Sequence, residues 1–275
     1  NSLNYKYEMP DVTLNHVYSI SQISKNNLIW DEEWKRVIYT SNSIVIVEDL
    51  NEQKTQRFLS EGNDPIYSLE ISINKKFLLA FTWQGHIDGT PMIYIWELST
   101  LKKRAQISIN QPILKSVKLS LNSNLLLVLS SEETEDSSVS VIGVWDFLED
   151  YAECLCRSQM PFSIEEAIWN LQLTNLEFVT RSKTGYTFWK IDDLQLKYQE
   201  GATDIYSENP NGEKAVRLNE DVYITCMSNC FWALETALVI IGLSNGFVWI
   251  VDTRTNNLLC QVKLLDSELF FVTVN

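Results

Sequence analysis

The sequence predicts an all-β fold, a β-propeller built of four-stranded antiparallel blades, and three observations lead to this prediction. An apolar strand that ends in Trp or Val, usually followed by an acidic residue, recurs along the 275-residue chain. The strand-ending residues stand at positions 47, 96, 145, 189 and 251, which gives steps of 49, 49, 44 and 62 residues. Each copy also holds four short runs rich in β-branched and aromatic residues, without helical periodicity. Repeats of this length and composition are typical of propellers.

The second copy shows the expected order of strands within a blade. Its first run, Ile66–Ile71, alternates between apolar and polar residues, and its second and third runs, Phe77–Trp83 and Ile93–Leu98, are nearly all apolar. Its fourth run, Lys103–Ser108, is mostly polar. This gradient fits a blade because strands near the propeller axis are packed on both faces, whereas the outer strand is half solvated.

The other copies repeat this order, and they set the expected boundaries of the blades. Their runs cover residues 27–30, 36–40, 43–47 and 55–59, then 114–119, 125–129, 139–145 and 154–157, then 166–173, 178–181, 186–191 and 194–198, and finally 222–227, 238–243, 247–251 and 258–262. We therefore expect blades at about 26–62, 63–109, 110–159, 160–203 and 204–265 of a segment that spans 1–275. Residues 14–20 are expected to form a closing strand, and 266–275 to hold a strand of a further blade, Leu269–Val274. The prediction is an incomplete ring or part of a larger, tandem propeller.

Charge and cysteine content limit the class of function. The net charge of −14 and pI of about 4.6 oppose binding to nucleic acid or to an anionic membrane surface. No apolar run approaches the roughly 18 residues of a membrane span, so we expect no membrane insertion. Five cysteines without a secretion signal favour reduced thiols and a cytoplasmic location. The pairs Cys154/Cys156 and Cys226/Cys230 lie in apolar runs, where Cys packs as a small hydrophobic residue.

The chain offers no recognisable catalytic, cofactor or metal motif. Its two histidines are His16, in a predicted strand, and His86, in a predicted loop, and neither accompanies a nucleophile motif. There is no phosphate-binding glycine loop. The run from His86 to Thr90 resembles half of a calcium loop but lacks the closing Glu, so its glycine is better explained as a turn residue. We expect no enzyme activity, no cofactor and no bound metal.

Three insertions indicate where a partner protein binds. Trp83–Pro91 and Ser130–Ser138 connect second and third strands, and Gly201–Asp221 connects one blade to the next. In a propeller both kinds of connection emerge on the same face, and binding residues concentrate on loops held by a rigid scaffold. Two of the three insertions are acidic, which favours partners with basic surfaces or Lys/Arg-rich segments. The expected partner-binding residues are Trp83, His86, Asp88, Glu132, Glu133, Glu135, Asp136, Glu208 and Glu213.

Several motifs resemble the echinoderm microtubule-associated-protein-like family and related cilia- and flagella-associated WD-repeat proteins. They are Asn15–Tyr18, Asn26–Leu28, Val37–Tyr39, Ser43–Val47 with Lys54–Arg57, Trp83–Pro91 before Ile93–Trp96, and Phe178–Gly185 before Phe188–Trp189. The resemblance covers residues 14–200 and implies a pair of joined WD40-type propellers that associate with microtubules or the axoneme. The chain departs from the family at Ser19–Ser24, where a glycine and basic residues are usual. The surface of tubulin is acidic, as this chain is, so the resemblance implies a structural role more than direct contact with tubulin.

These observations predict a non-enzymatic scaffold for protein–protein interaction in a ciliary, axonemal or other microtubule-associated assembly. The alternative is a WD-repeat subunit of another cytosolic complex, in trafficking or in a ubiquitin ligase. A propeller hydrolase or sugar-binding module is a third possibility, but the sequence offers no converging acids, histidines or metal ligands for it.

Overall fold

Five four-stranded antiparallel sheets make up the computed structural model of the chain. It describes residues 26–51, 55–84, 90–133, 138–147, 152–170, 176–183, 185–200, 218, 221–229, 238–253, 255 and 257–269. These residues contain twenty strands and no helix, and so none that could cross a membrane.

Each sheet is one blade, with its strands hydrogen-bonded in chain order. Blade 1 holds β1 (Leu28–Asp31), β2 (Arg36–Ser41), β3 (Ile44–Asp49) and β4 (Gln56–Ser60). Blade 2 holds β5 (Ile66–Ile71), β6 (Phe77–Thr82), β7 (Met92–Glu97) and β8 (Lys103–Ser108). Blade 3 holds β9 (Ile113–Leu119), β10 (Leu125–Glu133), β11 (Ser138–Asp146) and β12 (Glu153–Met160). Blade 4 holds β13 (Glu166–Trp169), β14 (Glu177–Arg181), β15 (Tyr186–Asp192) and β16 (Gln195–Glu200). Blade 5 holds β17 (Ile224–Asn229), β18 (Leu238–Leu243), β19 (Phe247–Asp252) and β20 (Asn257–Lys263).

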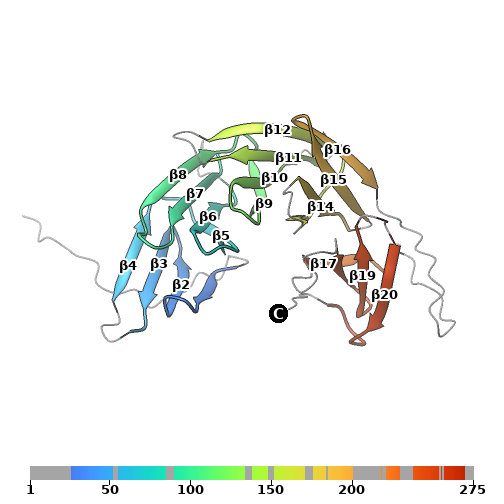
Figure 1. Cartoon of the computed structure of the whole chain (residues 1–275), viewed down its shortest axis with the longest axis horizontal. Coiled ribbons are helices and arrows are strands. Elements are labelled where there is room, and N and C mark those ends of the chain that lie inside the picture. The colour runs from blue at the N-terminus through green and yellow to red at the C-terminus, as the bar shows by residue number, and fades with distance from the viewer. Residues whose placement is uncertain are drawn as a thin grey trace, which may run out of the picture.

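The blades follow one another around an open arc (Figure 1). The first strand of each blade lies toward the concave centre, and the fourth strands β4, β8, β12, β16 and β20 lie on the convex side. Blades 1 and 5 stand at the two ends of the arc, and the described residues do not close a ring. The predicted fold class, an incomplete all-β propeller, is therefore confirmed.

Apolar packing between neighbouring blades forms the core. Side chains alternate between the two faces of a strand. Each inner strand therefore packs one set of side chains against the blade before it and the other set against the blade after it. Leu79 and Phe81 of blade 2, for example, pack with Leu126 and Val128 of blade 3 in one buried cluster. Equivalent clusters join blades 1 and 2, blades 3 and 4, and blades 4 and 5.

One position of the third strand is fixed by a repeated hydrogen bond. The backbone N–H two residues after Trp96, that of Leu98, donates to the carbonyl of Lys76 at 2.7 Å. The N–H two residues after Trp189 makes the same bond to the carbonyl of Leu176, also at 2.7 Å. Both tryptophans are almost fully buried against the preceding blade.

In blade 1 the residue equivalent to these tryptophans lies one position later than the sequence analysis predicted. The equivalent bond there runs from Leu50 N–H to the carbonyl of Lys35 at 3.1 Å, which places Glu48, and not the predicted Val47, at the tryptophan position. Val47 instead packs in the cluster shared with blade 2. The Glu48 carboxylate accepts hydrogen bonds from Tyr39 Oη at 3.2 Å and Gln56 Nε2 at 2.9 Å. The prediction was wrong here because a polar residue, Glu48, occupies this position in blade 1, so the last apolar residue of the run is Val47.

Polar contacts along the inner strands connect blades 2, 3 and 4. Lys118 Nζ of β9 lies 2.7 Å from Glu70 Oε2 of β5, and Glu70 Oε1 accepts the backbone N–H of Leu119 at 3.1 Å. Trp169 Nε1 of β13 donates to the carbonyl of Lys118 at 2.9 Å. Burial alone would lower the pKa of Lys118, but the adjacent Glu70 carboxylate more than offsets this, and the pKa is raised. The contribution of this pair to stability is therefore fully present at neutral pH.

Some predicted elements differ from the structure or lie outside it. The first strand of blade 5 begins at Ile224 and not at the predicted Val222. The first strand of blade 4 ends at Trp169, whereas the prediction extended it to residue 173. The predicted strand 14–20 lies outside the described residues, as does Leu269–Val274 apart from Leu269. Leu269 is buried against Cys226 on the face of blade 5 that points away from blade 4.

We expect Trp96→Ala to lower the free energy of unfolding by about 3–5 kcal/mol, because it leaves a cavity between blades 1 and 2. Trp30→Ala is the matched control, since the Trp30 side chain is 54% exposed and its loss should cost much less. Urea unfolding followed by circular dichroism measures both. Equal losses in the two variants would contradict the packing described above.

Removal of the Glu70 carboxylate should also lower the free energy of unfolding, because it removes contacts between blades 2 and 3. We expect Glu70→Ala to cost about 1–2 kcal/mol, since the pair is partly exposed, and Glu70→Gln to cost less because an amide oxygen can still accept the Leu119 N–H. A double-mutant cycle with Lys118→Met measures the coupling. Additive effects would show that the ion pair adds nothing to stability.

Candidate functional site

Only part of the predicted partner-binding surface lies in the described residues. Trp83 follows β6, and Glu132 and Glu133 lie in β10. These residues stand at the edge of the propeller where second strands end, which we call the upper edge. The predicted residues His86, Asp88, Glu135, Asp136, Glu208 and Glu213 lie outside the described residues.

Trp83 forms an exposed aromatic pair at the upper edge. Its ring stacks on that of Tyr67 of β5, with centroids 5.7 Å apart and an interplanar angle of 23°. The Trp83 side chain remains 42% exposed, while burial raises the pKa of the Tyr67 hydroxyl. The backbone carbonyl of Trp83 also accepts the N–H of Leu114 of blade 3 at 2.8 Å. A large, partly exposed ring that stacks on Tyr67 and whose backbone is hydrogen-bonded to the next blade is suited to contact another protein.

The predicted insertion Ser130–Ser138 is largely an extension of the β10–β11 hairpin. Glu132 pairs in register with Val139, and Glu133 with Ser138, so the two acids are strand residues and not loop residues. Three serines of this stretch are buried. Ser130 Oγ donates to the carbonyl of Val141 at 3.3 Å, and Ser140 Oγ accepts the backbone N–H of Ile164 at 2.8 Å, whereas Ser131 Oγ has no hydrogen-bond partner among the described residues. Glu132 is exposed at this end of the hairpin.

The thiols do not form a metal or nucleophile site among the described residues. No group of three or more His, Cys, Asp or Glu side chains in that part of the chain could hold a metal ion. Cys156 is buried between blades 3 and 4, and burial raises its pKa to about 11. Burial also raises the pKa of Cys154 and Cys226, whereas Cys260 is exposed.

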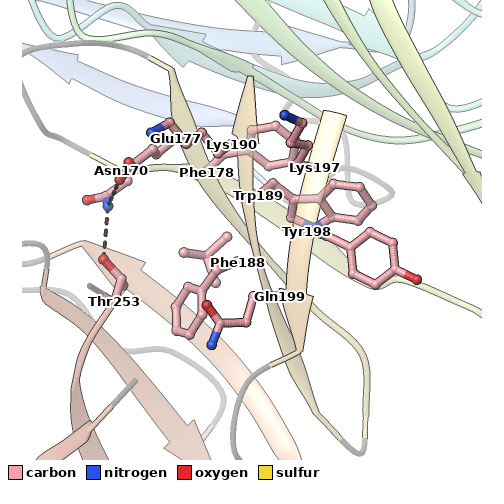
Figure 2. A pocket seen from close by; sticks show the side chains of 11 residues that line it. Asn170, Glu177, Phe178, Phe188, Trp189, Lys190, Lys197, Tyr198, Gln199 and Thr253 are labelled. Atoms are coloured by element: carbon pink, nitrogen blue, oxygen red, sulfur yellow. Dashed lines mark hydrogen bonds between the residues drawn. The ribbon is translucent and has the colours of Figure 1, made fainter. Parts of the chain in front are cut away.

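A groove between blades 4 and 5 is a second candidate site, which the sequence analysis did not identify. Its volume is about 370 Å³, and several of its lining residues, such as Asn170, Glu177 and Lys190, lie at the lower edge of the propeller, where first strands end and second strands begin. Asn170 lies at its inner end and donates from Nδ2 to Thr253 Oγ1 of blade 5 at 2.9 Å, as Figure 2 shows. This hydrogen bond joins the two blades at the lower edge.

One face of blade 4 forms the main wall of this groove. Figure 2 shows Phe188 and Gln199 on the side of the sheet that faces Thr253, with Trp189 and Tyr198 on the other side. Phe188 and Gln199 are partners in register on β15 and β16. The next pair on the same face is Lys190 and Lys197, both exposed. Lys197 Nζ lies 2.5 Å from Asp192 Oδ2, and this hydrogen bond lowers the pKa of Asp192.

One sequence signal could have identified this groove. The residue after the tryptophan position is acidic in four blades, as Asp49, Glu97, Asp146 and Asp252, and in each blade it pairs with the first residue of the second strand. In blade 4 the same position is Lys190, which pairs with Glu177. The charge of the side chain at this repeated position is therefore reversed in blade 4, and the residue that carries the reversed charge, Lys190, lines the groove.

Comparison with solved structures identifies the fold. No protein-family model and no curated protein matches the chain. It is similar to the β-propeller domain of Cps50 (Swd1) from Myceliophteria thermophila, with a TM-score of 0.56 and 13% identity over 75% of this chain and 59% of that one. It is also similar to the computationally designed protein Ika8, with a TM-score of 0.57 and 17% identity over 88% of this chain and 63% of that one. The chain thus spans less than two thirds of either neighbour.

These similarities support the propeller fold, and they do not support the narrower resemblance to the ciliary and microtubule-associated family.

We expect the cysteines to differ sharply in reactivity. Iodoacetamide at pH 8 should modify Cys260 readily and leave Cys154, Cys156 and Cys226 unmodified in the folded chain, because burial and raised pKa values limit the thiolate. Mass spectrometry of tryptic peptides measures the labelling, and guanidinium-unfolded protein is the control. Rapid labelling of Cys156 in the folded protein would contradict the packing of blades 3 and 4.

Proposed function

We propose that this chain is a non-enzymatic scaffold that binds another protein at its upper edge. The observation that carries the proposal is the exposed ring of Trp83, held against Tyr67 on a rigid blade and accompanied on the next blade by the exposed Glu132. The aromatic pair supplies apolar contact area at low entropic cost. The proposed binding surface also includes His86, Asp88, Glu133, Glu135, Asp136, Glu208 and Glu213.

The charge of this surface favours a partner with a basic surface or a Lys/Arg-rich segment. Glu132, Glu133, Glu135 and Asp136 lie within five residues of sequence, in a chain of net charge −14. Like charges gathered at one edge repel each other, and a basic partner relieves this repulsion. Electrostatic attraction of this kind acts mainly on the rate of association and weakens as salt shortens the Debye length from about 10 Å at 0.1 M.

The proposed setting is a ciliary, axonemal or other microtubule-based assembly in the cytoplasm. Its support is the sequence resemblance over residues 14–200, part of which falls on β2 and β3 of blade 1. Imaging of the tagged full-length protein in a ciliated cell tests this setting. Axonemal signal would support it, and a diffuse or vesicular location would favour the alternative scaffold roles in trafficking or ubiquitin ligation.

The binding surface can be tested with variants that preserve the fold. We expect replacement of Glu132, Glu133, Glu135 and Asp136 by Ser to leave the melting temperature nearly unchanged, since surface changes usually cost within about 0.5 kcal/mol. The same variant should capture less of its partner and show a weaker dependence of association rate on salt. Proximity labelling identifies the partner, and surface plasmon resonance over a salt series measures the rates.

Trp83→Ser tests the aromatic part separately and should speed dissociation more than it slows association. The matched control is Trp34→Ser, because Trp34 is exposed to a similar extent but lies at the lower edge of blade 1. Unchanged binding in both the four-acid variant and Trp83→Ser would show that the upper edge is not the partner site.

A further inference from the structure

We propose that the groove between blades 4 and 5 is a second docking site, which binds an extended acidic peptide through one large apolar side chain. The site lies at the lower edge of the propeller, opposite the surface proposed above, so the two can be tested independently. Its occupant would be a segment of another protein in which an apolar residue stands beside one or more Asp or Glu residues.

The size and lining of the groove fit one inserted side chain. Its volume of about 370 Å³ lies at the lower end of the range for specific ligand pockets. Val179 and Phe188 supply an apolar floor on β14 and β15, and they are partners in register on the face that points toward blade 5. Behind this sheet the ring of Trp189 stacks on Phe178 at 5.6 Å and contacts Tyr198 at 5.1 Å, which makes the wall rigid.

Blades 4 and 5 share an apolar cluster that includes Val179, Trp249 and Val251, and Phe188 is only partly buried against it. The backbones of these two blades come close at the inner strands β13 and β17, whereas blades 3 and 4 also approach each other at the outer strands β12 and β16. The Asn170–Thr253 hydrogen bond joins the blades at the lower edge. Asn170 is almost fully buried and also donates to Glu177 Oε2 at 3.4 Å, so its side chain is held by both partners.

Charge selects an acidic occupant. Lys190 and Lys197 stand directly opposite each other on neighbouring strands, an arrangement in which like charges destabilise a sheet. Asp192 is paired with Lys197, and Glu177 accepts a hydrogen bond from Asn170. Lys190 has no carboxylate within ion-pair distance among the described residues. A carboxylate of the partner placed at Lys190 would relieve the repulsion between the two lysines.

The position of Lys190 in the repeat supports the same occupant. Every other described blade carries an acid where blade 4 carries Lys190, so this position of the repeat is basic in blade 4 alone. Gln199 is exposed beside Phe188 and can donate and accept hydrogen bonds, which suits the backbone of an extended peptide.

Peptide selection tests the proposal on the full chain. A phage library of random peptides is selected against immobilised protein, and enriched peptides are synthesised and measured by fluorescence anisotropy. We expect the enriched sequences to combine Asp or Glu with a large apolar residue. Lys190→Glu together with Lys197→Glu should weaken their binding about tenfold or more, because each partner carboxylate then meets repulsion in place of attraction.

Two further variants make the result specific to the groove. Gln199→Trp places a large ring over the apolar floor and should abolish binding without changing the charge. Lys102→Glu with Arg104→Glu changes the net charge of the chain by the same amount at blade 2, where both residues are exposed, and should leave binding within about twofold. Unchanged melting temperatures show that each variant is folded.

Several outcomes would overturn the proposal. These are no enrichment of acidic peptides, or enriched peptides whose affinity is unchanged by both groove variants. Self-association of the chain that the lysine reversal abolishes would assign the groove to a second copy and would also overturn it. None of these results depends on the Trp83 surface, so failure here leaves the proposed scaffold function standing.

Discussion

The whole structure depends on packing between blades, because no blade can bury both of its faces alone. An inner strand such as β6 is apolar on both sides, with Leu78 and Ala80 toward blade 1 and Leu79 and Phe81 toward blade 3. Each blade therefore needs a neighbour on either side, and stability accumulates along the arc as in other repeat proteins. This constraint explains why tryptophan recurs at one position: Trp96 and Trp189 each fill the space against the preceding blade.

Two positions at which a blade departs from the repeat carry polar or charged side chains. At the tryptophan position blade 1 carries Glu48, whose carboxylate is hydrogen-bonded to Tyr39 and Gln56 on the face that points away from blade 2. At the following position blade 4 carries Lys190 in place of an acid, and there the blade faces a groove. A rigid scaffold tolerates such changes at its edges, since the packing rows between blades remain intact.

The two proposed surfaces lie on opposite edges and differ in chemistry. Trp83 and Glu132 offer an aromatic ring and negative charge at the upper edge, whereas Phe188 and Lys190 offer an apolar floor and positive charge at the lower edge. A scaffold with two complementary surfaces can hold two partners at once, and simultaneous engagement of linked sites raises the overall affinity.

The sequence by itself determined the fold class, the four-strand order and most strand positions, because apolar runs and recurring tryptophans report local burial directly. It also placed Trp83 at a loop edge, as a candidate partner-binding residue. Only the tertiary structure decided the register of blade 1, the extension of β10 to Glu133 and the existence of the groove. Register depends on hydrogen bonds between strands, as Leu50 with Lys35 shows, and a groove depends on the spacing of two blades. Neither is encoded in any single run of residues, so both become visible only when Asn170 and Thr253, 83 positions apart, are brought together.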